Sequence, residues 1–118
     1  MANIDLPTQR IESDEGSVIS YKTDTDTDEP ITTTDSFFIR NSGHERLLIK
    51  KGAGTVDVTI TTPLTVNGLA VADRVVAVAA SKDVVIGPFS PNIYNDSDGK
   101  VKVDFSVAAA IEVAVLQV

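Results

Sequence analysis

The chain has no cysteine and no tryptophan, and it has one histidine among 118 residues. Without cysteine it cannot form a disulfide-stapled scaffold, a thiolate metal site or a cysteine nucleophile. The histidine, His44, follows Ser42-Gly43 in a predicted turn, and no second histidine is present to complete a triad or a metal site with it. We expect His44 to be a solvated turn residue, and we expect neither a cofactor nor enzymatic activity.

Long apolar runs and signal segments are also missing. No stretch approaches the length of a membrane span, and residues 1–10 lack the apolar segment that export requires. Neither glycine-rich pattern that binds nucleotide phosphates occurs, and Gly52-Ala53-Gly54 alone is weak evidence for a phosphate-binding loop. We expect a single domain that is made and folded in a cytoplasm and makes no contact with a membrane.

Valine, alanine and threonine supply much of the apolar fraction of 42%, and this bias favours strands over helices. The clearest strand is 55–61, where Val56, Val58 and Ile60 alternate with polar side chains. Short strands separated by turn residues such as Asn67-Gly68 predict an all-β fold, an antiparallel β-sandwich of about seven or eight strands. The predicted strands are 17–21, 36–40, 46–51, 55–61, 73–80, 84–86, 101–105 and 111–118.

The net charge of −7 is concentrated in the first 35 residues. Nine acids stand there against Arg10 and Lys22, which gives 2 − 9 = −7, whereas residues 36–118 balance at 8 − 8 = 0. Such a segment would repel nucleic acid, and the remainder has no clustered basic face. We therefore predict no binding to nucleic acid, and we divide the chain into an acidic N-terminal arm, 1–35, and a β-sandwich domain, 36–118.

The acidic run within residues 22–30 has three interpretations. It is a cation site, a contact with a basic partner, or a solvated loop whose carboxylates repel one another. Alternate acids on an extended chain point to one side, which suits a partner better than a metal cage. The candidate contact residues are Asp24, Asp26, Asp28 and Glu29.

The stretch 84–105 contains two prolines and an Asp/Gly cluster that is similar to part of a calcium loop. If Gly99 is the sixth position of such a loop, the first position falls on Tyr94 and the twelfth on Phe105, and neither can be the required ligand. A hairpin turn is the simpler interpretation. Asn95, Asp96 and Asp98 would satisfy backbone donors there while Gly99 takes a positive φ.

The C-terminal strand, 111–118, is largely apolar on both faces, as in a buried strand or a subunit interface. Because the predicted core is thin in aromatic residues, oligomerisation is a natural source of further stability. We expect a homo-oligomer, with a trimer as the working number. The candidate interface residues are Val113, Val115, Leu116 and Val118.

Several short segments together resemble small structural proteins of tailed bacteriophages, the capsid decoration or cement proteins. The segments that carry the resemblance, within residues 36–118, are 48–52, 56–63, 66–74, 86–91 and 94–101. The resemblance implies a non-enzymatic virion component that binds the major capsid protein on the exterior of the shell and stabilises it. The acidic segment 1–35 lies outside it, and we expect this segment to reach a neighbouring subunit.

Two alternatives remain open. One is a tail or head–tail junction component, which would assemble as a ring. The other, from a different class, is a carbohydrate-binding or adhesion module, whose sites present exposed aromatic rings as stacking platforms. Only Tyr21, Phe89 and Tyr94 are candidates for such a platform.

Overall fold

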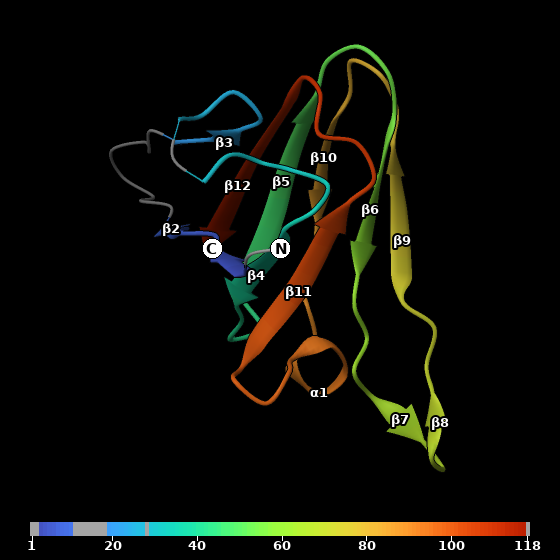
Figure 1. The fold of residues 1–118 in the computed structure, drawn as a ribbon. Coiled ribbons are helices and arrows are strands. Elements are labelled where there is room, and N and C mark those ends of the chain that lie inside the picture. Colours follow the sequence, from blue (N-terminus) through green and yellow to red (C-terminus); the bar gives the residue numbers. More distant parts are fainter. Residues whose placement is uncertain (1–2, 11–18, 28, 118) are drawn as a thin grey trace.

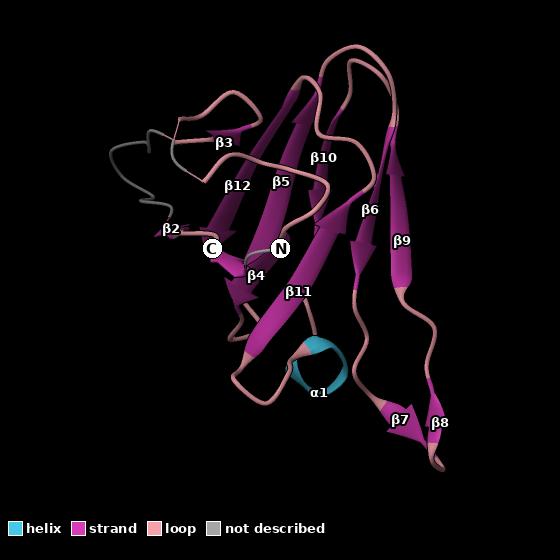
Figure 2. Ribbon diagram, viewed as in Figure 1, coloured by secondary structure: helices cyan, strands magenta, loops and turns pink. Residues whose placement is uncertain are grey.

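The computed structural model describes residues 3–10, 19–27 and 29–117, and almost all of its regular structure is β-strand (Figure 1). The single helix of these residues is one turn long (Figure 2). The predicted all-β class is therefore confirmed. The elements are β1 (Asn3–Asp5), β2 (Thr8–Arg10), β3 (Lys22–Thr23), β4 (Ser36–Arg40), β5 (Glu45–Lys51), β6 (Val56–Ile60), β7 (Thr65–Val66), β8 (Leu69–Ala70), β9 (Arg74–Val78), β10 (Asp83–Ile86), α1 (Pro91–Tyr94), β11 (Lys100–Phe105) and β12 (Ile111–Gln117).

The strands form two main sheets and a small hairpin. The first sheet has the order β1-β4-β11-β6-β9, and the second has the order β10-β5-β12-β2, with β3 also paired to β12. Most neighbours are antiparallel, as expected, but β1 is parallel to β4 and β2 is parallel to β12. The sheets are therefore mixed. Both exceptions are N-terminal strands that join strands far away in the chain.

Alternation along the strands explains which side chains are buried. In β6 the three apolar side chains are buried while Asp57 is exposed, and β11 buries Val101, Val103 and Phe105 in the same way. Phe105 meets Phe37 of β4 edge to face, with ring centroids 5.5 Å apart. Buried side chains of β5 and β12 belong to the same cluster, so the two sheets share one hydrophobic core.

The turn between β4 and β5 carries the chain from one sheet to the other. Asn41 is buried there, and its side-chain amide donates to the backbone oxygen of Phe89 and to the side chain of Asn95. Glu45, also buried, accepts hydrogen bonds from the N–H and hydroxyl of Ser42 and from the side-chain amide of Gln117. Burial by itself would raise the pKa of Glu45, but these hydrogen bonds and one from the His44 backbone outweigh it and lower the pKa.

The described part of segment 1–35 is packed into the body of the protein. Ile4, Leu6 and Ile31 are buried in the common core, and the backbone N–H of Leu6 donates to the backbone oxygen of Phe38. The strand predicted at 17–21 falls partly outside the described residues, and the described strand, β3, follows it. Where we expected a separate arm, residues 3–10 complete the edges of both sheets.

Candidate interaction surfaces

The acidic turn that follows β3 is held by its own carboxylates. Asp24 accepts hydrogen bonds from the backbone N–H groups of Ala110 and Ile111, at 3.2 and 3.3 Å. It thereby ties the turn to the first residue of β12, at one end of the second sheet. This candidate contact residue already has a structural role within the chain.

Asp26 has a local role in the same turn. Its carboxylate accepts from the backbone N–H and the hydroxyl of Thr23, each at 3.0 Å, and these two bonds lower its pKa. Glu29 is exposed, and its backbone oxygen accepts from the Lys22 ammonium group at 2.8 Å. Asp28 lies outside the described residues. Of the described candidate contact residues, Glu29 is the one that is exposed.

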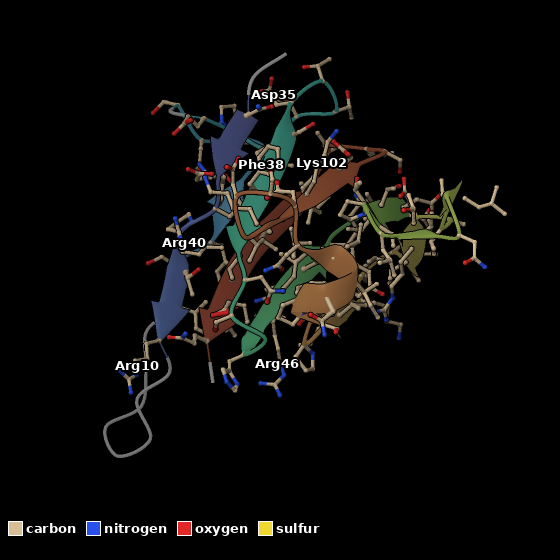
Figure 3. All side chains as sticks on the ribbon, turned by 90° about the horizontal axis from the view of Figure 1, so that it is seen from below. Arg10, Asp35, Phe38, Arg40, Arg46 and Lys102 are labelled. Atoms are coloured by element: carbon tan, nitrogen blue, oxygen red, sulfur yellow. The ribbon has the colours of Figure 1, made fainter. Side chains whose placement is uncertain are left out.

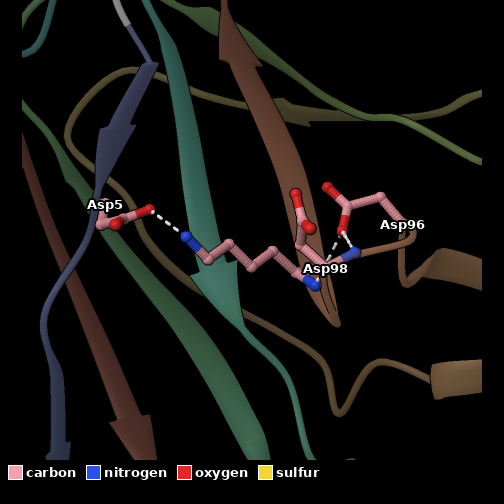
Figure 4. Close-up of polar contacts among 4 residues, drawn as sticks. Asp5, Asp96 and Asp98 are labelled. Atoms are coloured by element: carbon pink, nitrogen blue, oxygen red, sulfur yellow. Dashed lines mark hydrogen bonds and ion pairs between the residues drawn. The ribbon is translucent and has the colours of Figure 1, made fainter.

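The turn at residues 95–99 is closed by Asp96 and Gly99 as predicted, but it joins α1 to β11, so the prediction of a hairpin was wrong (Figure 4). One oxygen of Asp96 accepts from the backbone N–H groups of Asp98 and Lys100, at 2.8 and 3.1 Å, and Gly99 has φ = 74°. The Lys100 ammonium group forms an exposed ion pair with Asp5 at 3.0 Å. Among the described residues, no group of three or more histidine, cysteine or acidic side chains could hold a metal ion.

The candidate interface strand, β12, lies inside the second sheet. It pairs with β5 along one side and with β2 and β3 along the other, so its backbone is covered on both sides. Val113 and Val115 are buried in the core of the chain itself, whereas Leu116 is half-buried. Val118 lies outside the described residues. A subunit contact through β12 stays a prediction, and it would use the outer face of this strand.

A surface cavity of about 380 Å³ lies beside the acidic turn where β5 ends and β12 begins. Charged residues line it, and two of them are bound to the backbone. The Asp24 carboxylate is held by backbone N–H groups, as described above. Lys51 is only 4% exposed, and its ammonium group donates to the backbone oxygens of Ala53 and Ala109. The remaining charged residues that line the cavity are Lys50, Asp83 and Glu112.

A projecting hairpin, β7–β8, is an exposed feature for which the sequence predicted no function. It lies between the end of β6 and the beginning of β9 and extends away from the first sheet (Figure 1). The predicted turn is confirmed, since Asn67 and Gly68 have φ values of 53° and 78°. Leu69, 73% exposed, is the most exposed large apolar side chain described. The alternation of apolar and polar residues did not predict this hairpin, because each of its strands has only two residues.

All four arginines lie toward one end of the strands. Arg10 and Arg40 end their strands, Arg46 is the second residue of β5, and Arg74 begins β9. The pairing of Arg10 with Gln117 and of Arg40 with Lys100 places them at the end opposite Asp24. Figure 3 labels three of these arginines. The described acidic turn and the arginines therefore occupy opposite ends of the sheets.

The aromatic residues are packed rather than presented. Phe89 is buried and meets Tyr94 edge to face, with ring centroids 5.9 Å apart. Tyr21 is half-buried, and the Lys50 ammonium group lies 5.1 Å from its ring centroid. His44 is exposed in its turn, as expected. The described residues contain no helix long and apolar enough to cross a bilayer.

Comparisons with protein-family models, with curated proteins and with solved structures found no match to this chain.

Proposed function

We propose that this protein is a non-enzymatic structural component that binds the exterior of a bacteriophage capsid and stabilises it. The observation that carries the proposal is which charged side chains around the acidic turn are hydrogen-bonded within the chain and which are exposed. The Asp24 and Lys51 side chains beside the cavity of about 380 Å³ are bound to the backbone, whereas Glu29 of the acidic turn is exposed. Such a surface suits docking onto another protein better than chemistry in a cleft. The resemblance of residues 36–118 to decoration proteins points the same way.

The fold that we propose for this role is a β-sandwich, with the two main sheets as its layers. Their common core supports this arrangement. The protein would be made in the host cytoplasm and would then occupy the capsid exterior, with the major capsid protein as its partner. Its net negative charge would keep it from binding the genome during assembly.

The capsid contact that we propose centres on the acidic turn and is electrostatic. Co-sedimentation of the purified protein with heads that lack it tests this contact. We expect saturable binding that weakens as salt rises, because exposed charges are screened beyond about 10 Å at 0.1 M salt. Glu29→Lys should weaken the binding several-fold. Binding that is equally strong at high salt and in this variant would contradict the proposed contact.

The matched control is Asp98→Lys, which makes the same charge change at an exposed acid in the turn before β11. We expect it to bind heads as the unmodified protein does. Deletion of the whole N-terminal segment is a poorer test, because it would also remove Ile4 and Leu6 from the core. Binding to tails in place of heads would favour the head–tail junction alternative. Glycan binding abolished by Tyr94→Ala would favour a carbohydrate-binding module.

A further inference from the structure

The outermost strand of the first sheet, β9, has an uncovered edge. Within the described residues its one strand partner is β6, and Figure 1 shows nothing on its far side. The free N–H and C=O groups of such an edge are a template for a further strand. Proteins usually block an edge of this kind with charges, proline, a bulge or a very short strand.

The other outer strands have such protection. Strands β1 and β2 have three residues each. Strand β10 has four residues, and Gly87-Pro88 follows its end directly. In contrast, β9 has five residues, contains no proline, and has its one charge at the first position, Arg74.

The side chains of β9 are also suited to a contact. Its register against β6 places Val76 and Val78 on the core side, and Val75 and Ala77 on the outer face beside Thr59 and Asp57. Val75 is 58% exposed. A β-branched side chain at an open edge favours pairing with another strand.

We propose that two copies of this chain associate through β9, in an antiparallel, two-fold pairing that joins their first sheets into one. With the axis at Val76, Val75 lies opposite Ala77 of the second copy, and Arg74 lies opposite Val78. No like charges meet in this register, so the strand is complementary to itself. The pairing is independent of capsid binding, and it yields a dimer in place of the trimer that served as the working number.

The projecting hairpin fits the same arrangement. It precedes β9 in the chain, so in an antiparallel pair it extends past the end of the β9 strand of the second copy. There it would lie beside the connection at residues 79–82, where Ala79 and Ala80 are small and exposed. The exposed Leu69 would thereby gain an apolar contact.

Local charge favours a second copy as the occupant. Each chain has a net charge of −7, so two copies repel in most orientations. The charged residues immediately before β9 and between β9 and β10 are Asp73, Arg74, Lys82 and Asp83, which balance. Two β9 edges therefore approach without the repulsion that two acidic turns would meet.

The test introduces like charges across the two-fold axis. In the double variant V75E/A77E, a glutamate at position 75 of each copy faces a glutamate at position 77 of the other, and both positions are exposed in the single chain. By sedimentation equilibrium we expect the unmodified protein at twice its chain mass of 12.5 kDa, and a dimer dissociation constant at least about tenfold higher for the variant. Mixing V75E/A77E with V75K/A77K should restore association. Val85→Glu, on the outer strand β10 of the second sheet, should leave it unchanged.

A single cysteine provides a second measurement that is independent of the charge variants. Because the chain has no cysteine, Val76→Cys should form a disulfide-linked dimer under mild oxidation, whereas Val85→Cys should not. An unmodified protein that stays monomeric overturns the proposal, and so does a V75E/A77E variant that dimerises normally. If β9 pairs with another strand only after heads are added, the proposal is also overturned, because the partner of the edge would then be a protein of the head and not a second copy of this chain.

Discussion

At the residue scale, buried polar groups position the connections between the sheets. Glu45 is 2% exposed, and its carboxylate is surrounded by donors from Ser42, His44 and Gln117. A buried charge is tolerated only when it is well hydrogen-bonded, and here the donors come from the turn before β5 and from the last residue of β12. Hydrophobic alternation alone would place an apolar residue at position 45. The reason for a glutamate became visible only in the folded chain.

Glu45→Gln should destabilise the protein by about 1–3 kcal/mol at pH 7, because the new amide group would face the donating amide of Gln117. The folded-state pKa of Glu45 lies below its ordinary value of 4.5. Its contribution is therefore fully present above the unfolded-state pKa and is lost as pH falls through the folded-state pKa. Urea unfolding from pH 7 down to pH 3 should show the difference between the two proteins shrinking toward acid pH.

The control is Glu112→Gln, at an exposed carboxyl on β12. It should change the free energy of unfolding by no more than about 0.5 kcal/mol. An equal loss in both variants would contradict the structural role of Glu45.

At the element scale, close backbone approaches decide how neighbouring strands meet. After β10 the chain passes Gly87, which has φ = 124°. A Cβ atom there would lie 3.0 Å from the backbone oxygen of Glu45 and 3.2 Å from the Cα of Arg46. The sequence indicated a break at Gly87-Pro88, but the contact with β5 depends on the tertiary fold.

Gly87→Ala should be more destabilising than Gly54→Ala. Both positions have a positive φ, which costs a non-glycine residue about 1–2 kcal/mol, but a Cβ at Gly54 would meet nothing within 4 Å. The clash with β5 should add about 1–3 kcal/mol at Gly87. Thermal or urea unfolding of the two variants measures the difference, and equal losses would show that β10 and β5 are not so closely apposed.

At the scale of the whole molecule, the described residues of the N-terminal segment are part of the fold. Charge led us to set residues 1–35 apart, because all of the net charge lies there. Ile4, Leu6 and Ile31 of that segment fill positions in the common core, while most of its described acids face solvent or bind the turn. A compositional boundary is therefore not a structural boundary in this chain.

A pair of leucine substitutions tests this. Leu6→Ala, at a side chain 5% exposed, should cost about 2–5 kcal/mol of unfolding free energy, because it leaves a cavity in the core. Leu69→Ala, at a side chain 73% exposed, should change the stability of the single chain by about 0.5 kcal/mol or less. The measurement should be made on V75E/A77E, the variant designed to be monomeric. A Leu6→Ala variant as stable as its parent would contradict the packing of Leu6 in the core and support the prediction of a separate N-terminal arm.

The sequence by itself determined the local features. Alternation identified the buried face of β6 and β11, and Asn67-Gly68 and Gly99 identified two turns, because these properties depend on neighbouring residues. Only the tertiary structure decided which strands become neighbours. It placed β4 and β5 in different sheets, closed β12 on both sides and left β9 open. Strand periodicity states which side chains share a face, but pairing depends on contacts between residues far apart in the chain.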